Sequence, residues 1–338
     1  MRNLYQIGPK KMCLVNSGNQ ISIVIVTYNS EKYILKNLRS IEKYCKNIIN
    51  QIIISDSNST DDTLSIVEKY FPNVEIIKGE NKGYGAALNA GFKKCINEII
   101  IGANDDIYFL DNSLSNIFQT FESQRNIGIV GPQILNDDKT LQRSITNNPN
   151  IIKDSFQIIF PKIINTNNSY FKSVIGILQI FFSIGRFDNH NNEKIVTAVK
   201  GAFFIFRKKV FQDTNGFDER IAFDTEEQIF CLRAKNKGWS TLYNPSIKIV
   251  HIAGASLGSP GSQSNIKRFS VKIQSTLLFY RYYKFFFWYI LSYLSFVMSV
   301  SIRVSYLLLI NHNDWKKMFH VLKLLLLNKI TSTKIYRN

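Results

Sequence analysis

Short apolar runs alternate with helical patterns from residue 21 to about residue 130. Five runs rich in β-branched residues predict strands of the length typical of a buried sheet. They are Ile21–Thr27, Gln51–Ser55, Val74–Lys78, Ile99–Ala103 and Ile127–Val130. Strands that alternate with helices pair in parallel through right-handed crossovers. The pattern therefore predicts an α/β fold with a doubly wound, mostly parallel sheet.

The segments between these runs carry helix signals. Ser30 is a candidate N-cap for the first helix, and Ser59 or Thr60 is a candidate for the second, which Pro72 ends. The third and fourth predicted helices run from about Tyr84 to Cys95 and from Ser113 to Phe121.

The alternation breaks after Gly131. Residues 143–195 form an insertion rich in Asn, Ile and Phe, and its apolar patches Ile151–Phe160 and Val174–Ile184 are too short to span a bilayer. A lid, an acceptor-side insertion and amphipathic helices on a membrane are all compatible with this composition. The pattern then predicts a strand over Val196–Phe206, a turn at Asn215-Gly216, a helix over Thr225–Lys237 and a strand over Ile247–His251.

An uncharged run of 18 residues, Phe285–Ile302, lies near the C-terminus between Lys284 and Arg303. As a helix it would be about 27 Å long, just short of the ~30 Å hydrocarbon core of a bilayer. Its aromatic residues and flanking charges favour an interfacial or re-entrant helix over a crossing, and a buried helical hairpin is the alternative. We therefore predict an α/β domain over residues 20–258 and a membrane-associating helical region over residues 265–338.

The charge distribution supports this division. The 338-residue chain carries 42 Lys and Arg against 25 Asp and Glu, a net charge of +17, and residues 267–338 hold twelve basic residues and one acidic residue, Asp314. Because these basic residues are interleaved with Phe, Tyr, Trp and Leu, they favour an anionic membrane surface over nucleic acid as the partner.

The four cysteines and the N-terminal segment bear on the compartment. The cysteines are widely spaced without CxxC pairs, so neither a zinc site nor a disulfide framework is indicated, and a reducing compartment fits. The segment from Lys10 to Gln20 lacks the apolar core of a signal peptide. We expect the α/β domain to lie in the cytosol.

The strongest candidate for chemistry is Asn104-Asp105-Asp106, which directly follows an apolar strand. Two adjacent carboxylates at such a position are costly unless water, hydrogen-bond donors or a cation compensate them. Mg²⁺ and Mn²⁺ prefer oxygen ligands and commonly bridge carboxylates to phosphates. The alternative interpretation is a solvated turn, which Asn and Asp also favour.

Four further elements accompany this one in a fixed order. They are Ile21–Asn29, Ile53–Thr63, Asn81–Gly91 and Gly201–Ser256. Asp56 follows a predicted strand and is suited to accept a hydrogen bond from the imide N–H of uracil or thymine. The glycines Gly83 and Gly85 do not complete GxGxxG, because Leu88 stands where the third glycine belongs.

In this order and spacing the elements resemble the family 2 glycosyltransferases of GT-A fold, over about Ile21 to Gly258, and within them the rhamnosyltransferase-type enzymes of bacterial surface polysaccharides. The resemblance implies inverting, nonprocessive transfer from a nucleoside-diphosphate sugar, with dTDP-rhamnose favoured, to a polyprenyl-diphosphate-linked or glycan acceptor. It implies a location at the cytoplasmic face of the bacterial plasma membrane. No QxxRW sequence, which processive synthases carry, follows the base region.

The resemblance also assigns residues to the site. It implies a divalent cation, Mn²⁺ or Mg²⁺, held by Asp106 with Asp105 alongside and with His251 at the metal or diphosphate. The residues assigned to nucleotide-sugar binding are Thr27, Tyr28, Asn29, Asp56, Asn81, Gly83, Asn89, Asp105 and Gly201.

The general base implied by the resemblance is Glu227, at the position where the family usually carries Asp. A carboxylate there would take the proton of the acceptor hydroxyl during inversion. Glu226 is the rival for this role, and Ile229 stands where many members carry another acidic residue. A third interpretation is that both glutamates only stabilise a helix N-terminus.

Two other functions stay open at this stage. A nucleotide-dependent oxidoreductase is disfavoured by Leu88 and by the Asn-Asp-Asp sequence. A catalytically degenerate family member, acting as a scaffold in a polysaccharide assembly complex, is kept open by Glu in place of Asp at the base position. The sequence leaves the oligomeric state undetermined.

Overall fold

The computed structural model describes residues 20–159, 190–221, 224–252, 262–310 and 312–327, with the side chains of the fourth range described from residue 269. The N-terminal segment, the apolar patch Val174–Ile184 and Ser256 lie outside the described residues.

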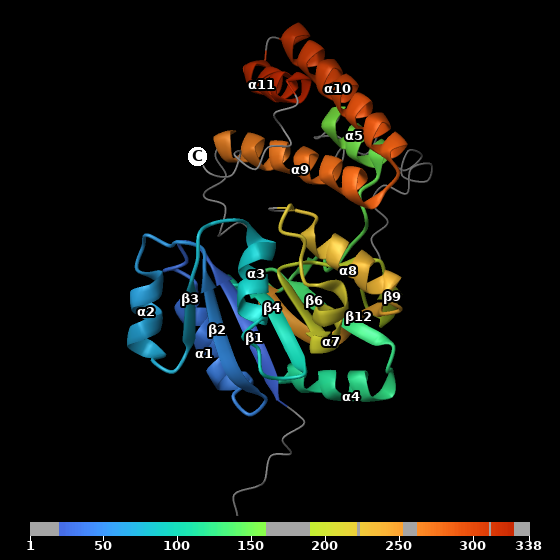
Figure 1. Ribbon diagram of the computed structural model, residues 1–338. Helices are drawn as coiled ribbons and strands as arrows, with labels where there is room; N and C mark the ends of the chain where they lie inside the picture. The colour runs from blue at the N-terminus through green and yellow to red at the C-terminus, as the bar shows by residue number, and fades with distance from the viewer. Residues whose placement is uncertain (1–19, 160–189, 222–223, 253–261, 311, 328–338) are drawn as a thin grey trace, which may run out of the picture.

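A large mixed sheet forms the centre of the α/β body (Figure 1). Among the described residues its strand order is β3-β2-β1-β4-β11-β6-β12-β5, with β7 on β6 and β9 on β12, while β8 and β10 pair separately. The strands are β1 Ile21–Thr27, β2 Ile49–Asp56, β3 Glu75–Lys78, β4 Ile99–Asn104, β5 Ile107–Phe109, β6 Ile127–Leu135, β7 Leu141–Gln142, β8 Ile145–Thr146, β9 Lys194–Val196, β10 Ala198–Val199, β11 Phe203–Arg207 and β12 Ser240–His251.

Helices cover both faces of this sheet and form a further layer beyond one end of it (Figure 1). The helices are α1 Ile34–Tyr44, α2 Thr63–Tyr70, α3 Tyr84–Phe92, α4 Asn116–Ser123, α5 Ile151–Ile159, α7 Lys208–Thr214, α8 Glu226–Asn236, α9 Ser262–Tyr283, α10 Phe286–Leu309 and α11 Trp315–Leu326. A 3₁₀ turn, Ser113–Ser115, precedes α4.

The parallel pairing that the sequence predicts is confirmed for the N-terminal strands. Strand β1 pairs in parallel with β2 and β4, and β2 pairs in parallel with β3. Strand β12 also lies parallel to β6, whereas β11 lies antiparallel between β4 and β6. The result is a mostly parallel sheet with an antiparallel insertion at its centre.

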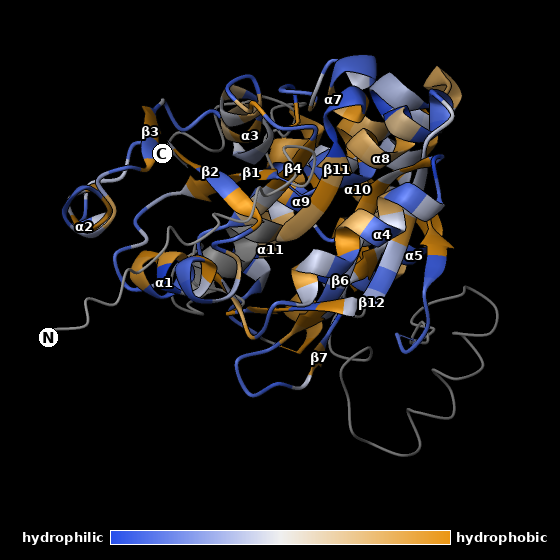
Figure 2. Cartoon of the chain, turned by 90° about the horizontal axis from the view of Figure 1, so that it is seen from below, coloured by the Kyte–Doolittle hydropathy of each residue, from blue (hydrophilic) through white to orange (hydrophobic). Residues whose placement is uncertain are grey.

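Alternation along the strands builds a core on each face of the sheet. In β1, Ile21, Ile23 and Ile25 pack with α1, α2 and α4, whereas Val24 and Val26 pack with α3, α7 and α8. The two-residue period of a strand sends successive side chains to opposite faces, so a doubly wound sheet needs apolar residues at both parities. Figure 2 shows the central strands as mostly hydrophobic.

Helix α3 lies unusually close to β1. A Cβ atom at Gly91 would lie 2.3 Å from Val24 Cγ1, so a side chain cannot fit there without displacing the helix. The sequence predicts that the third helix ends at about Cys95, but α3 ends at Phe92.

The prediction of one strand over Val196–Phe206 is wrong. The segment is divided into β9, β10 and β11, which pair with β12, with β8, and with β4 and β6 respectively. A continuous apolar pattern gives the local preference for strand, but the partners available in the tertiary structure decide where each strand ends. The break before β11 leaves Lys200 and Gly201 between strands.

The predicted helix caps are also wrong. Helix α1 begins after Tyr33 and α2 after Asp62, and neither has a side-chain cap among the described residues. The hydroxyl of Ser30 donates to Asp105 instead, and that of Ser59 donates to Asp56. Both serines therefore support carboxylates at the sheet edge.

The helical layer consists of α9, α10, α11 and, from the insertion, α5 (Figure 1). Ile158 of α5 packs in one cluster with Phe296 and Val300 of α10 and Val321 of α11. Helix α9 packs against the α/β body through Phe279, which shares a cluster with residues of α8. The apolar run Phe285–Ile302 lies largely in α10. This helix packs on one side only, since many of its other side chains are exposed.

Candidate active site

Three strands end side by side at the edge where the sequence predicts the site. In the sheet register Thr27 lies beside Asp56, and Val26 lies beside Asn104. Ligands of open α/β sheets bind beyond the carboxyl ends of such strands. The fold thus brings Thr27, Asp56 and the Asn104-Asp105-Asp106 sequence to one edge.

Asp56 is buried, and its carboxylate is held from two directions. Thr27 Oγ1 donates to Oδ1 at 2.8 Å, and the backbone N–H of Ser59 donates to Oδ2 at 2.9 Å. Carboxylate oxygens have further lone pairs, so the fixed group keeps capacity to accept a hydrogen bond from a ligand. Tyr28, directly after Thr27, is 41% exposed.

Two backbone features border Asp56. Asn29 has φ 53° and its side-chain oxygen accepts from the Thr60 N–H at 2.8 Å, which ties the loops after β1 and β2 together. The loop that holds Asn81 follows β3, whose Lys78 pairs with Asp56. It ends at Gly83, where φ is 112°, a conformation that glycine adopts without strain.

Asp105 is oriented by its own chain. Its Oδ2 accepts a hydrogen bond from the Ser30 hydroxyl, and its backbone oxygen accepts from Asn37 Nδ2 at 3.1 Å. Asn37 is fully buried in α1. These contacts fix the turn that carries the two aspartates.

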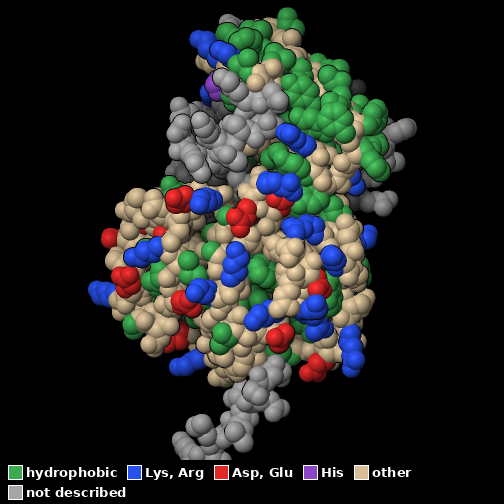
Figure 3. All heavy atoms as spheres, viewed as in Figure 1, with side chains coloured by type: hydrophobic (Ala, Val, Ile, Leu, Met, Phe, Trp, Pro, Cys, Tyr) green, Lys and Arg blue, Asp and Glu red, His purple; other side chains and the backbone are tan. Residues whose placement is uncertain are grey.

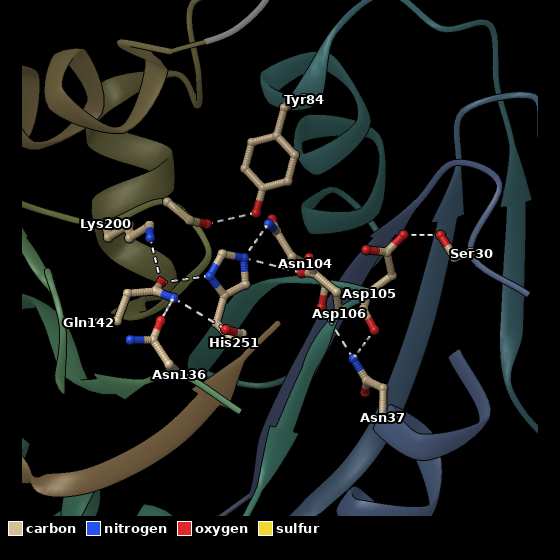
Figure 4. A network of polar contacts seen from close by, with 11 residues as sticks. Ser30, Asn37, Tyr84, Asn104, Asp105, Asp106, Asn136, Gln142, Lys200 and His251 are labelled. Carbon is tan, nitrogen blue, oxygen red and sulfur yellow. Dashed lines mark hydrogen bonds and ion pairs between the residues drawn. The ribbon is translucent and has the colours of Figure 1, made fainter. Parts of the chain in front are cut away.

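Asp106 faces His251 (Figure 4). The two residues meet because β12 pairs with β5, which places His251 beside Ile107, and because the Ile252 N–H donates to the Asp106 carbonyl oxygen at 2.9 Å. His251 Nε2 lies 3.2 Å from Asp106 Oδ1, and both side chains are almost completely buried. Oδ1 of Asp106 nevertheless accepts no hydrogen bond within the described part of the chain.

This pair suits a divalent cation. A buried carboxylate oxygen without a donor is costly, and a cation compensates it. Within the described ranges no group of three or more His, Cys, Asp or Glu side chains converges as a metal site. Asp106 and His251 would therefore supply two ligands, and substrate oxygens and water would supply the others, as is common for Mg²⁺.

Gln142 connects His251 to Lys200 (Figure 4). Gln142 Oε1 lies 2.7 Å from His251 Nδ1 and accepts a hydrogen bond from Lys200 Nζ. Gln142 Nε2 donates to Asn136 Oδ1 at 2.8 Å and to the His251 carbonyl oxygen at 3.2 Å. Burial lowers the pKa of Lys200, and the negative charges of Asp106 and Glu227 oppose that shift.

The two glutamates at the start of α8 differ in their surroundings. Glu226 is 4% exposed and its Oε2 accepts from the Thr225 N–H at 2.9 Å, whereas Glu227 is half-buried beside Gly201. Burial raises the pKa of Glu227 to about 7, and a backbone hydrogen bond from Gly201 and the charge of Lys200 oppose the shift. Burial, followed by the charge of Glu227, raises the pKa of Glu226 well above its usual range.

Tyr84 lies within electrostatic reach of both pairs of acidic residues. Its hydroxyl donates to the Gly201 carbonyl oxygen at 2.8 Å. Burial raises the pKa of its phenol, and the glutamates of α8 and then the two aspartates after β4 raise it further. Tyr84 and Lys200 thus both lie within electrostatic reach of Asp106 and of Glu227.

Asn89 is the one assigned residue among those that line a pocket beside Asp218 and Tyr283. Its side chain is buried, accepts from the Phe217 N–H at 2.8 Å and donates to Glu219 Oε1 at 2.9 Å. It lines a separate pocket together with Asp218 and Tyr283.

Several residues of the site escape the sequence patterns. Ser30 reads as a helix cap, and Lys200 lies inside an apparent strand. Gln142 belongs to a strand of two residues that pairs with β6, so no periodic signal marks it. Tyr84 stands at a recognisable helix start, but the sequence does not indicate that its hydroxyl lies across from the glutamates.

Comparison with known proteins gives a consistent family. The model of the family "Glycosyl transferase family 2" matches residues 22–214, more than half of the chain. An N-acetylglucosaminyl-diphospho-decaprenol L-rhamnosyltransferase of Mycobacterium tuberculosis is 22% identical over 253 residues, which cover 70% of this chain and 78% of that protein. The poly(ribitol-phosphate) β-N-acetylglucosaminyltransferase TarS of Staphylococcus aureus is 31% identical over 103 residues, 29% of this chain and 18% of TarS.

Solved structures share the fold at low sequence identity. The mannosyltransferase PcManGT of Pyrobaculum calidifontis, solved with GDP-Man and Mn²⁺, matches with a TM-score of 0.51 and 12% identity over 94% of this chain and 86% of PcManGT. GalNAc-T7, solved with UDP, GalNAc and Mn²⁺, matches with a TM-score of 0.52 and 13% identity over 79% of this chain and 49% of GalNAc-T7. The expected GT-A fold, with an apolar C-terminal helix, is confirmed.

Proposed function

The chain belongs to glycosyl transferase family 2, and we propose that it moves one sugar per encounter, with inversion, from a nucleoside-diphosphate sugar to a hydroxyl group of a lipid-linked or glycan acceptor. The observation that carries this proposal is the buried pair of Asp106 and His251 at the edge where β1, β2 and β4 end. Among the described residues Oδ1 of Asp106 accepts no hydrogen bond there, and Lys200 lies within electrostatic reach of both Asp106 and Glu227. In this proposal Asp106 helps to bind the diphosphate of the donor, and Glu227 accepts the proton of the acceptor hydroxyl group.

In this proposal Glu227 is the general base. It takes the proton of the acceptor hydroxyl while the oxygen forms a bond to the anomeric carbon, and the bond from that carbon to the diphosphate oxygen breaks. A base with a pKa of about 7 is matched to neutral pH, because it is partly deprotonated and still basic enough to accept the proton. Glu226 instead supports the start of α8.

The leaving diphosphate lies on the Asp106 side in this proposal. Asp106 and His251 would hold a divalent cation, Mn²⁺ or Mg²⁺, which supplies charge compensation for the departing diphosphate. Lys200 adds a positive charge within electrostatic reach of both Asp106 and Glu227. The Mn²⁺ in the structures of PcManGT and GalNAc-T7 is consistent with this assignment.

The nucleoside would lie at Asp56. Its carboxylate, held by Thr27 and Ser59, is suited to accept a hydrogen bond from the imide N–H of thymine or uracil, and the exposed Tyr28 would line the same site. The name of the Mycobacterium tuberculosis relative, N-acetylglucosaminyl-diphospho-decaprenol L-rhamnosyltransferase, supports a rhamnose donor and a polyprenyl-diphosphate-linked acceptor, and we propose dTDP-rhamnose as that donor. Asn29, Asn81 and Gly83 would form the loops around the nucleotide.

A donor panel tests this function. Thermal shift of the full chain with Mn²⁺ and each nucleoside-diphosphate sugar should give the largest stabilisation with dTDP-rhamnose, since a ligand at 100 times its Kd stabilises by about 2.7 kcal/mol. Release of free nucleoside diphosphate should accompany binding. Binding without any release or transfer would support the scaffold alternative, and stabilisation by NAD(P) alone would overturn the proposal.

We also propose that α10 and α11 hold the enzyme at the cytoplasmic face of the membrane, with residues 20–258 as the catalytic domain and 265–338 as the attachment region. The 24 residues of α10 form the one described helix that is long and apolar enough to cross a bilayer. Figure 3 shows hydrophobic side chains gathered over this end of the molecule. The exposed apolar side chains of α10, of α11 and of the residue before α10 include Phe285, Phe286, Phe287, Leu294, Met298, Leu309 and Phe319.

Vesicle binding tests the attachment. Leu294 and Met298, each 58% exposed, lie four residues apart on one face of α10. The double substitution Leu294→Glu with Met298→Glu should release the full chain from anionic vesicles, because charged side chains do not enter the apolar layer. Ile96→Glu, at a 66% exposed position of the α/β body, is the matched control and should still sediment. Equal sedimentation of both variants would contradict the proposal.

A further inference from the structure

We infer that Gln142 sets the tautomer of His251, so that the neutral imidazole carries its proton on Nδ1 and presents an unprotonated Nε2 to Asp106. This inference rests on the proposed function, because it concerns the histidine that would hold the cation there. Gln142 does not touch a reacting atom and is therefore a positioning residue.

The orientation of the Gln142 amide follows from two partners that have one hydrogen-bonding role each. The ammonium group of Lys200 only donates, and the carbonyl oxygen of His251 only accepts. Lys200 Nζ lies at Oε1 of Gln142, and the carbonyl oxygen lies 3.2 Å from Nε2. If the Gln142 amide were flipped, its NH₂ group would face the ammonium of Lys200 and its oxygen would face the carbonyl oxygen of His251. Neither contact is a hydrogen bond, so the Gln142 oxygen must face Lys200.

The same oxygen lies 2.7 Å from His251 Nδ1. An amide oxygen accepts only, so Nδ1 must carry a proton to make this contact. Which nitrogen of a neutral histidine is protonated is set by the hydrogen bond that the other nitrogen makes. The proton on Nδ1 therefore leaves Nε2 with its lone pair.

The surroundings of Nε2 agree with this assignment. Asn104 Nδ2, an amide nitrogen with N–H groups to donate, lies 3.4 Å from Nε2. Asp106 Oδ1 lies 3.2 Å from Nε2, yet it accepts no hydrogen bond among the described residues. A lone pair and a carboxylate oxygen that face each other at this distance are a suitable pair of ligands for a cation.

Histidine nitrogen NMR of the full chain tests the inference. The chain has four histidines, so selective ¹⁵N labelling of the imidazole rings gives few resonances, and those of His251 are identified by their loss in His251→Phe. At pH 8.5, without metal or donor, the wild type should show protonated Nδ1 and unprotonated Nε2. The inference is overturned if Nε2 carries the proton.

Two variants of Gln142 separate positioning from packing. Gln142→Leu removes the acceptor and should move the proton to Nε2, where Asp106 accepts it, whereas Gln142→Glu keeps an acceptor and should retain the proton on Nδ1. Gln133→Leu is the matched control, because Gln133 lies on β6 and donates to the carbonyl oxygen of His190 rather than to His251. Retention of the Nδ1 proton in Gln142→Leu would overturn the role of Gln142.

Binding of Mn²⁺ alone, measured by electron paramagnetic resonance of the free ion, gives a second readout. Loss of a residue that orients a metal ligand typically weakens binding by about 10- to 100-fold. We expect this loss in Gln142→Leu and no loss in Gln142→Glu or Gln133→Leu. Equal affinity in all variants would overturn the inference while leaving sugar transfer untouched, whereas a correct tautomer without any transfer would count against the proposed function only.

Discussion

The site contains two pairs of adjacent carboxylates, Asp105-Asp106 after β4 and Glu226-Glu227 at the start of α8, and the two pairs are built differently. In the aspartate pair, Asp106 Oδ1 lies 3.2 Å from His251 Nε2. In the glutamate pair burial is the main influence on both members and raises both pKa values. The first pair is thus suited to a cation and the second to a proton.

The pairs also share a principle. In each pair the two carboxylates have different neighbours. Asp105 receives the Ser30 hydroxyl and Glu226 receives the Thr225 N–H, whereas Asp106 and Glu227 lie within reach of Lys200. Adjacent residues of one type therefore take different roles because their hydrogen-bond partners differ.

The largest effect should come from Asp106→Asn. The isosteric amide removes the charge opposite His251, and compensation of the leaving group by a cation is worth several kcal/mol, so kcat/KM should fall about a thousandfold or more. Calorimetry should show that Mn²⁺ no longer strengthens donor binding. Asp105→Asn is the control, and a larger loss there would reverse the roles within the pair.

Glu227→Gln should follow, with a fall in kcat of about two to four orders of magnitude and little change in donor affinity, because only proton removal is lost. Glu226→Gln should have a small effect. Glutamine keeps a side-chain oxygen that can accept the hydrogen bond from the Thr225 N–H, which is the contact that Glu226 makes. If Glu226→Gln is the more damaging substitution, Glu226 is the base.

The sequence predicts one pair better than the other. Asn104-Asp105-Asp106 follows a run whose strand character is a local property, and β4 ends at Asn104, one residue beyond the predicted end at Ala103. The role of Glu227 depends on Gly201, which is distant in sequence and lies in a segment that reads as a continuous strand. Resemblance to the family was needed to select it.

The supporting residues are the part that sequence reasoning misses most. Gln142 and His251 are 109 residues apart and meet only because β7 and β12 both pair with β6. Ser30 has the local signal of a helix cap, but a buried carboxylate is a stronger competitor for its hydroxyl than an exposed helix end. Long-range pairing, rather than local propensity, decides both contacts.

The pH dependence of transfer sharpens the comparison further. The base must be deprotonated, and burial raises the pKa of Glu227 to about 7, so kcat/KM should rise with pH through about 7 and level off above it. Kinetics with saturating metal at every pH would measure this limb. An acidic limb that stays near the usual glutamate pKa would contradict the assignment of Glu227 as a buried base.

The smallest effect should be the shift of that limb in Lys200→Met. The positive charge of Lys200 opposes the rise in the pKa of Glu227, so its removal should raise that pKa and move the acidic limb to higher pH. If Lys200 served only to pack the site, its removal would lower activity without moving the limb. Lys93→Met is the matched control, because Lys93 lines the separate pocket with Asn89 and does not face Glu227. An unshifted limb in Lys200→Met, or an equal shift in both variants, would show that the two carboxylate pairs are not coupled through Lys200.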